Sequence, residues 1–530
     1  MDSLLKWMIR FGDLIYGRRI QRQTREYLAG EAETQRRATR ERSSALLEEF
    51  AAAPGPHAVL GRTFWDEPAE ARLPLSYLAE AHAIITGGTG AGKTLSVMTI
   101  VEAILDSESP DLSFGVLDAK GELFERTLYL VARRLAQLPA ARAEALRQKI
   151  VIIDLSSPDP VTSYNIACPW SGSDLDYFAT SRVETLQELL PSGDGLSLRG
   201  SSIVKHALLL LAEHRLPFSY FDRVVSSEVF RGKLLARSQD EGLRYYFKSH
   251  FPGEGRATIG AVRARLNSAL LSSLSLKLAL SGTAAPDLRA LQDTSRFCLI
   301  NCAGPNIPRA TARTLQALFL SDIRQAVFAR RTRTPYLWMC DEAQNFFRTR
   351  YLRENMTDLL TMSRSFGSFF LYLTQNLSTA LQDRDMLEVL HTNIRWSLSL
   401  RGTAQDTAFL KPALPVTGRR PKPRPNPYAP LEFYKPAEER ELLLQEIAHL
   451  PDFTGWLWLK SRTGEAIEIR TRIPDIPRGA AFEEAVNRIR MDARIGYRVA
   501  RGAHLAETSR RDAEWLAADD ARTIDQGLKN

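Results

Sequence analysis

The sequence predicts a three-layer α/β fold with an all-α domain inserted into it. Three observations support this prediction: a glycine-rich loop lies between a short apolar run and a helix, further short runs are rich in Val and Ile, and a long segment with helical spacing interrupts them. The chain has 530 residues, of which 44% are hydrophobic and 25% charged. This composition is that of a globular protein with two or three folded units.

Residues 1–53 are expected to form an amphipathic, then charged, helical segment ahead of the core. Its first turns carry an apolar stripe made of Leu4, Leu5, Trp7, Met8 and Ile9. Such a helix docks on its own protein or on a partner, or lies peripherally on a membrane surface. No window approaches the roughly 20 apolar residues that a membrane-spanning helix needs. We therefore expect no transmembrane helix and a cytoplasmic protein, with the core beginning after Pro-Gly-Pro at 54–56.

Short apolar runs mark the strands of the predicted core. They lie at 82–86, 113–118, 149–154, 296–301, 335–341, 368–374 and 395–400, with a last pair around 455–470. Between the third and fourth runs the apolar residues fall at helical spacing. We therefore expect a nucleotide-binding domain of residues 54–170 and 290–475, an all-α insertion of residues 171–289, and a peripheral, charged helical tail from 476 to 530.

The glycine-rich loop matches the pattern G-x-x-x-x-G-K-[ST] from Gly87 to Thr94. Its glycines let backbone N–H groups turn toward phosphates, and the following helix presents its positive end to them. Lys93 would reach the β and γ phosphates of ATP, and the Thr94 hydroxyl would bind Mg²⁺. The residues expected to bind the nucleotide are Gly87, Gly88, Thr89, Gly90, Ala91, Gly92, Lys93, Thr94 and Leu95.

A second apolar run ends in the carboxylates that ATP hydrolysis needs. Asp341 follows the run 335–340 and is expected to hold Mg²⁺ through water. Glu342 is expected to orient and deprotonate the attacking water. Such a pair is typical of ATPases that work in rings, where an arginine of the neighbouring subunit completes the site.

Downstream residues offer that arginine and a phosphate sensor. Arg364 precedes the run 368–374, and Gln375 follows it. Arg364 could neutralise the charge of the transition state in the neighbouring subunit, and Gln375 could sense the γ phosphate. Arg395 and Arg401, which flank the next run, are the alternative arginines.

Charge and cysteine content add two expectations. The 70 Lys and Arg residues exceed the 62 Asp and Glu residues by 8, which is compatible with a polyanionic partner, although so small an excess is often a solvated surface. The basic segments 346–355 and 418–425 are candidate phosphate contacts. The four cysteines, Cys168, Cys298, Cys302 and Cys340, have neither zinc-site nor disulfide-framework spacing and are expected to be core thiols.

Four ordered segments resemble the coupling ATPases of conjugation and type IV secretion, the TraD/TraG-like branch of the HerA/FtsK superfamily. The segments are HAIITGGTGAGKT (82–94), VLDAKGELFE (116–125), WMCDEAQ (338–344) and MSRSFGSFFLYLTQNLS (362–378). The resemblance spans about residues 57–170 and 290–405. It implies a RecA-like core, a homohexamer that moves DNA through its centre without reading sequence, an arginine finger at Arg364 and a DNA-responsive glutamine at Gln375. It also implies a relaxase or relaxosome and type IV secretion components as partners.

The chain departs from that family in three ways. Family members usually carry an N-terminal pair of transmembrane helices and a proline where this chain has Ala119, and the tail beyond about 475 matches nothing assignable. Two alternatives therefore remain open at this point. One is a soluble HerA-like DNA pump in DNA processing, repair or defence, and the other is a nucleotide-switched adaptor that binds secretion substrates.

Overall fold

The computed structural model describes most of the chain from residue 40 onward. The described residues are Arg37, 40–107, 112–170, 172–189, 196–375, 377, 384–403, 407–418, 420–423, 432–460, 465–476, 479–492 and 497–527, with side chains up to 516. The expectations for the apolar stripe at residues 4–9 and its membrane or partner contact lie outside these residues. No helix in the described ranges is long and apolar enough to cross a membrane.

Strands alternate with helices in the two parts of the chain that flank the helical segment α6 to α12. The strands are β1 (His57–Thr63), β2 (Glu70–Pro74), β3 (His82–Thr86), β4 (Ser113–Asp118), β5 (Ile150–Asp154), β6 (Val161–Thr162), β7 (Phe297–Asn301), β8 (Tyr336–Cys340), β9 (Ser368–Thr374), β10 (Ile394–Leu400), β11 (Thr454–Leu459), β12 (Ile467–Thr471) and β13 (Arg498–Val499). The α-helices are α2 (Leu75–Ala79), α3 (Lys93–Asp106), α4 (Glu122–Gln137), α5 (Ala140–Lys149), α6 (Leu175–Leu189), α7 (Leu198–Glu213), α8 (Phe221–Ser226), α9 (Glu228–Arg237), α10 (Glu241–Tyr245), α11 (Arg256–Leu270), α12 (Leu274–Leu280), α13 (Leu288–Asp293), α14 (Arg309–Phe328), α15 (Arg350–Met362), α17 (Arg384–Asn393), α18 (Pro436–Ala448), α19 (Ala480–Met491) and α20 (Arg501–Gly527). Short 3₁₀ or π turns are η1 (Phe218–Tyr220), η2 (Tyr246–His250), η3 (Phe251–Gly253), η4 (Ala343–Phe347), η5 (Ser363–Phe366) and η6 (Ala408–Ala413).

One mixed sheet organises the core. Within the described residues it has eleven strands in the order β2-β1-β12-β11-β10-β3-β9-β8-β4-β7-β5. The strands from β10 to β5 are parallel, and β11, β12, β1 and β2 continue the sheet in antiparallel fashion. Strand β9 lies between β3 and β8, so the segments that follow these three strands meet at the carboxyl edge of the sheet. Ligands bind at this edge in open α/β sheets.

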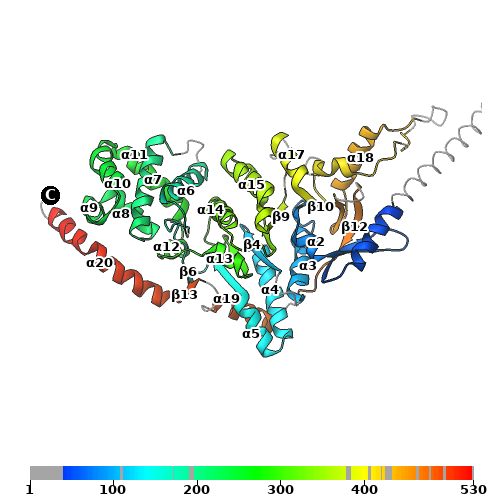
Figure 1. Cartoon of the computed structure of the whole chain (residues 1–530), viewed down its shortest axis with the longest axis horizontal. Coiled ribbons are helices and arrows are strands. Elements are labelled where there is room, and N and C mark those ends of the chain that lie inside the picture. The colour runs from blue at the N-terminus through cyan, green and yellow to red at the C-terminus, as the bar shows by residue number, and fades with distance from the viewer. Residues whose placement is uncertain are drawn as a thin grey trace, which may run out of the picture.

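Helices cover both faces of the sheet, as the three-layer prediction requires. Along β3, Ala83 and Ile85 belong to the core cluster that includes residues of α3 and α4. Ile84 belongs to the cluster on the opposite face, with residues of α14 and α15, because successive side chains of a strand alternate. Figure 1 shows α14 and α15 on one side of the sheet and α4 and α19 on the other. The chain has an α/β core in which one mostly parallel sheet lies between two helical layers, and the predicted α/β class is confirmed.

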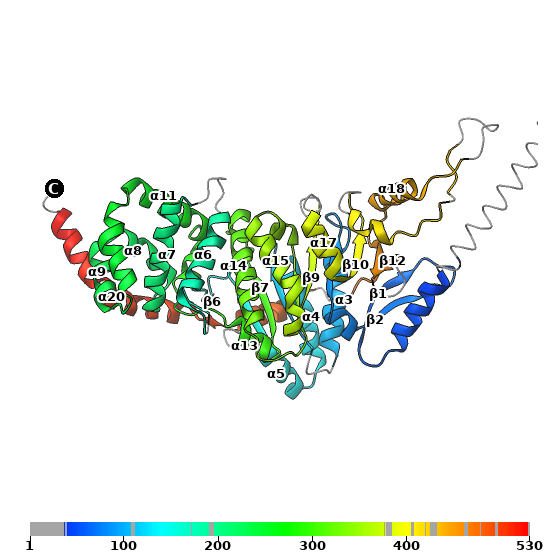
Figure 2. The ribbon, with the colours of Figure 1, turned by 45° about the horizontal axis from the view of Figure 1, so that its top comes forward.

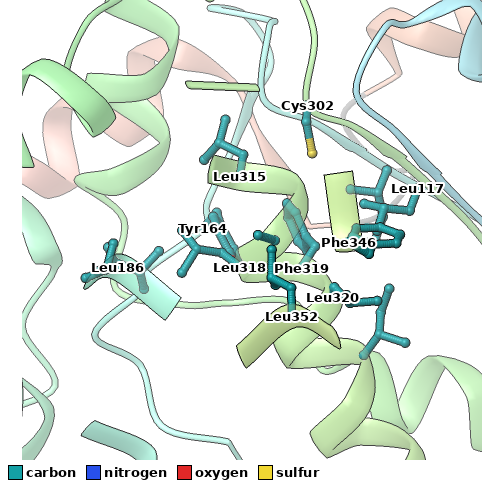
Figure 3. Close-up of a cluster of buried hydrophobic side chains, with 14 of the residues drawn as sticks. Leu117, Tyr164, Leu186, Cys302, Leu315, Leu318, Phe319, Leu320, Phe346 and Leu352 are labelled. Carbon is teal, nitrogen blue, oxygen red and sulfur yellow. The ribbon is translucent and has the colours of Figure 1, made fainter. Parts of the chain in front are cut away.

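An all-α unit formed by α6 to α12 packs against α14. Tyr164 stacks on Phe319 with ring centroids 4.3 Å apart, and Figure 3 shows both within a cluster that also contains Leu186 of α6 and Leu352 of α15. Beside this cluster, the Arg182 guanidinium donates to Asp322 across 2.6 Å, and both side chains are buried. The core of the all-α unit is therefore continuous with one face of the sheet.

The C-terminal segment from residue 480 onward packs against the core and the all-α unit, although it is rich in charged residues. In α19, Val486 and Ile489 are buried against α4, and β13 pairs with β6. Helix α20 then runs along the all-α unit, as Figures 1 and 2 show. Trp515 is buried there, 4.7 Å from the Arg237 guanidinium and hydrogen-bonded through its carbonyl to Lys233. A few apolar side chains therefore anchor this charged segment, whose other residues in α20 are largely exposed up to 516.

Candidate nucleotide-binding site

The glycine-rich loop follows β3 and leads directly into α3. Gly92 is the residue before the helix, with φ of 109° in the left-handed region, and a Cβ on it would lie 2.8 Å from the ring of Phe453. Gly87 has φ of 155°, and its Cβ would meet the Leu400 side chain at 2.9 Å. Only glycine fits these two positions without strain. The strand, loop and helix context that a phosphate-binding loop requires is therefore present.

Lys93 lies folded back over this loop. Its ammonium donates to the carbonyl oxygens of Gly87 at 2.8 Å and Gly88 at 2.9 Å. Burial lowers the pKa of Lys93, although the nearby Asp341 carboxylate opposes this effect. An incoming phosphate would offer the ammonium a charged acceptor in place of two neutral carbonyls, and charge-assisted hydrogen bonds are the stronger kind.

Asp341 lies at the end of β8 beside a second buried carboxyl group. Its backbone N–H donates to the Leu117 carbonyl at 3.0 Å, which places it next to Asp118 at the end of β4. Burial, followed by the charges of Asp118 and Glu342, raises the pKa of Asp341 to about 7. Burial also raises the pKa of Asp118. Without a cation, this edge of the sheet therefore disfavours two ionised carboxylates.

Thr94 and Asp341 fit the requirements of Mg²⁺. Both offer hard oxygen donors at the same edge of the sheet, and the Thr94 hydroxyl makes no hydrogen bond within the described part of the chain. No group of three or more His, Cys, Asp or Glu side chains that could hold a metal occurs among the described residues. Mg²⁺ commonly binds through one or two carboxylates together with substrate phosphates and water.

Glu342 follows Asp341 and is held by side-chain donors. Its φ of 52° lies in the left-handed region, which costs a non-glycine residue about 1–3 kcal/mol. Gln375 Nε2 donates to Glu342 Oε1 at 2.7 Å, and Gln344 Nε2 donates to Oε2. The Lys120 ammonium forms an ion pair with Oε1. Of these donors, the sequence analysis assigned a role only to Gln375.

Gln375 links Glu342 to the glycine-rich loop. Its amide oxygen accepts a hydrogen bond from the Thr89 hydroxyl at 3.2 Å. Its backbone N–H donates to Gln344 Oε1 at 3.4 Å, and the Thr374 hydroxyl donates to the same oxygen at 3.0 Å. Gln375 thus lies between the loop and Glu342, where a γ-phosphate sensor is expected.

Lys120 is a site residue that the sequence analysis did not identify. It belongs to the turn DAKGE (118–122), in the second of the segments that resemble the coupling ATPases. Polar residues that directly follow a parallel strand gather at the carboxyl edge of the sheet. This signal was available for Lys120, but its pairing with Glu342 also requires β4 and β8 to be neighbours.

Arg364 lies far from the loop of its own chain. It is exposed at the amino end of β9, whereas Gln375 follows the carboxyl end of this seven-residue strand. At about 3.3 Å per residue the two ends are roughly 20 Å apart. Burial and, to a lesser degree, the charge of Arg364 lower the pKa of His82, the first residue of β3, to about 3. Arg364 is therefore too far away to contact a phosphate held by the loop of its own chain.

The two alternative arginines lie at opposite edges of the sheet. Arg395 is near the amino end of β10, where its carbonyl accepts from Lys460 N–H at 2.9 Å. Arg401 lies beside the glycine-rich loop, and its carbonyl accepts from Gly88 N–H at 2.6 Å. Its guanidinium pairs with Asp452 at 2.7 Å. Arg401 is therefore positioned to support the loop of its own chain.

A cleft of about 1410 Å³ extends from Thr89, Glu342 and Gln375 across the carboxyl edge of the sheet. Arg309, Arg313 and Arg348 line it, and none of these three forms an ion pair within the described part of the chain. Arg348 belongs to the basic segment 346–355. In the other basic segment, 418–425, Arg420 pairs with Glu446, and Lys422 pairs with Glu438 at 3.1 Å.

The cysteines contribute no chemistry to this site. All four are free thiols, and Cys298, Cys302 and Cys340 are buried in the sheet or directly after it. Burial raises the pKa of each of these three thiols. Cys168 is half-buried, and burial also raises its pKa. The expectation of core thiols is confirmed for the three buried residues.

No protein-family model matches the chain, and no curated protein matches it either. Among solved structures, the chain is similar to the bacterial conjugative coupling protein TrwBΔN70 at 16% identity, covering 82% of this chain and 98% of that chain with a TM-score of 0.46. It is similar to VirB4 of Thermoanaerobacter pseudethanolicus at 14% identity, covering 82% and 99% with a TM-score of 0.48. It is also similar to the cytoplasmic domain of the type VII secretion ATPase EccC of Thermomonospora curvata at 14% identity, covering 84% of this chain and 32% of that chain with a TM-score of 0.31. At these identities the likeness concerns the fold.

Proposed function

We propose that the chain is an ATP-driven DNA translocase of the coupling-protein type, which delivers DNA or a nucleoprotein to a transfer apparatus. The observation that carries the ATPase part is the convergence of Lys93, Asp341, Glu342 and Gln375 at one edge of the sheet. The solved structures that the chain is similar to include TrwB in complex with ADP and Mg²⁺. We extend nucleotide and Mg²⁺ binding to this chain as part of the proposal.

The side chains divide the hydrolysis between them. Lys93 binds the β and γ phosphates, and Thr94 and Asp341 would hold Mg²⁺, which when bound neutralises phosphate charge. Glu342 orients a water and takes its proton as the water oxygen bonds to the γ phosphorus. The bond from the γ phosphorus to the bridging oxygen breaks, and ADP leaves with that electron pair. Gln375 contacts both the loop and Glu342, so it can pass the presence of the γ phosphate between them.

A ring is part of the proposal because Arg364, the proposed finger, lies away from the loop of its own chain. Arg364 lies at the far end of β9 and can reach a γ phosphate only in a second copy of the chain. An arginine supplied from a partner subunit is worth about 10³–10⁵ in kcat in related phosphoryl transfer. We propose that six copies assemble and that each Arg364 serves the next subunit.

The proposed DNA partner rests on charge. The net charge is +8, and the guanidinium groups of Arg309, Arg313 and Arg348 line the cleft that begins at Glu342. Contacts of this kind bind the phosphate backbone without reading bases and weaken as salt rises. A relaxase or relaxosome and type IV secretion components are the proposed partners for delivery.

Steady-state phosphate release with and without DNA tests the proposal. We expect turnover of about 1 per second or more with DNA, stimulation by DNA of unrelated sequences, and loss of stimulation at high salt. Lys93→Ala is the inactive control. Absence of turnover with every DNA tested would overturn the translocase, and slow turnover unaffected by DNA would instead favour a nucleotide-switched adaptor.

A further inference from the structure

We propose that Lys120 is a latch that keeps Glu342 in a resting position, so that hydrolysis begins only when this ion pair opens. The inference rests on the proposed function, because it concerns the regulation of the same site. Lys120 Nζ and Gln375 Nε2 both bond to Glu342 Oε1, and Gln344 Nε2 bonds to Oε2. A general base must turn a free carboxylate lone pair toward the attacking water. In this arrangement Lys120 and Gln375 occupy both lone pairs of Oε1, which leaves the carboxylate one free lone pair, on Oε2.

A rigid turn aims Lys120 at Glu342. The Asp118 carboxylate accepts the Lys120 backbone N–H at 2.7 Å and the Phe124 N–H at 2.9 Å, so one buried side chain fixes both the turn and the start of α4. Gly121 has φ of 90°, which closes the turn. On the other strand, the left-handed backbone of Glu342 directs its side chain back toward β4. The ion pair therefore joins two backbone positions that are each locally constrained.

Lys120 is more exposed than Glu342, and an exposed partner allows the ion pair to open and close. The Lys120 side chain is 44% exposed, whereas that of Glu342 is 14% exposed. Lys120 can swing into solvent without leaving an ammonium buried, since its long side chain carries the charge at a flexible tip. Glu342 would keep its two amide donors, and Oε1 would regain a lone pair. An ion pair with a half-exposed partner is weaker than one buried on both sides, so its opening is within reach of substrate or DNA binding.

The same network gives the nucleotide a route to the latch. Thr89 in the glycine-rich loop donates to Gln375, and Gln375 donates to the oxygen that Lys120 occupies. A γ phosphate placed at Lys93 adds an acceptor beside Thr89 and negative charge near Lys120. The Lys120 ammonium then has two possible anionic partners, Glu342 and the γ phosphate. The position of Gln375 changes with that of the loop, because Thr89 donates to it.

The test is the DNA-free turnover of Lys120→Ala. We expect its kcat for ATP to rise about two- to fivefold, as for the loss of a weak ion pair, with KM within about twofold of wild type. Lys120→Arg should restore the wild-type kcat, and the rise should vanish when Glu342→Gln is added. Lys411→Ala is the matched control, because Lys411 is 45% exposed and pairs with Glu441 on the surface. Lys120→Gln, with thermal unfolding recorded, provides a second variant.

Three results would overturn the latch. A fall in kcat toward that of Glu342→Gln would make Lys120 a residue that activates the base, and a several-fold rise in KM would make it a nucleotide ligand. An unchanged kcat in both Lys120→Ala and Lys120→Gln would also contradict it. If the wild-type protein itself hydrolyses no ATP, the proposed function fails, and this outcome is distinct because it is seen before any variant is compared.

Discussion

Replacing Asp341 with asparagine should stabilise the nucleotide-free protein. Burial, Asp118 and Glu342 together raise the pKa of Asp341 from its usual 3.8 to about 7. The unfolded chain therefore ionises this group more readily than the folded chain does. A carboxyl group whose pKa is higher in the folded state than in the unfolded state contributes its full stabilisation to the folded protein below about pH 3.8. This contribution is lost as the pH rises through about 7.

The size of the effect follows from the shift. A rise from 3.8 to about 7 amounts to at most about 4 kcal/mol above pH 7, at about 1.36 kcal/mol per pH unit. At pH 5.5 the same reasoning gives about 2 kcal/mol. Asparagine keeps the shape of aspartate and cannot ionise, so Asp341→Asn removes this penalty at both pH values.

Unfolding measured at pH 5.5 and pH 8, without nucleotide or Mg²⁺, checks this prediction. The variant should unfold at a temperature several degrees above wild type at pH 8, with a smaller gain at pH 5.5. Asp66→Asn is the control, because Asp66 is exposed and its pKa is lowered by Arg40, so its replacement should change stability little. An Asp341→Asn protein that is no more stable at pH 8, or equally stabilised at both pH values, would refute the reasoning.

Three further outcomes are expected. Glu342→Gln should lower kcat about 10²–10⁴-fold while a fluorescent ATP analogue binds with wild-type affinity; a loss of binding would contradict a role in the chemical step. Arg364→Ala and Lys93→Ala should each be inactive alone and regain activity when mixed, because a mixed assembly pairs an intact loop with an intact finger; no recovery in verified mixed assemblies would place Arg364 outside the site. Trp515→Ala should destabilise the all-α unit by about 3–5 kcal/mol, seen as faster hydrogen exchange in α9 and α20, and unchanged exchange would mean that α20 is not anchored there.

The strands of the parallel sheet could be predicted because burial on both faces makes them continuous apolar runs. The hairpin of β1 and β2 was not predicted. Its strands include Arg62, Glu70 and Arg72, and β1 is placed by pairing with β12, some 400 residues later in the chain. Register between such distant segments is set by the folded sheet and leaves little trace in local composition.

The same distinction applies to the site. The loop and the two carboxylates after β8 could be predicted, because each has a local signature. The contacts of Lys120 with Glu342 and the closeness of Asp118 to Asp341 depend on the order of the strands, since they require β4 to lie beside β8. Local sequence identifies which side chains reach the edge of the sheet, and only the fold determines which of them meet.

Electron microscopy of Glu342→Gln with ATP, Mg²⁺ and DNA is the most direct test of the central claim. The substitution keeps the loop intact and slows hydrolysis, so bound ATP persists. The account predicts six copies around one DNA, with Arg364 of each subunit at the γ phosphate held by Lys93 of the next. Monomers that bind ATP without DNA, or a ring in which Arg364 faces solvent, would contradict it.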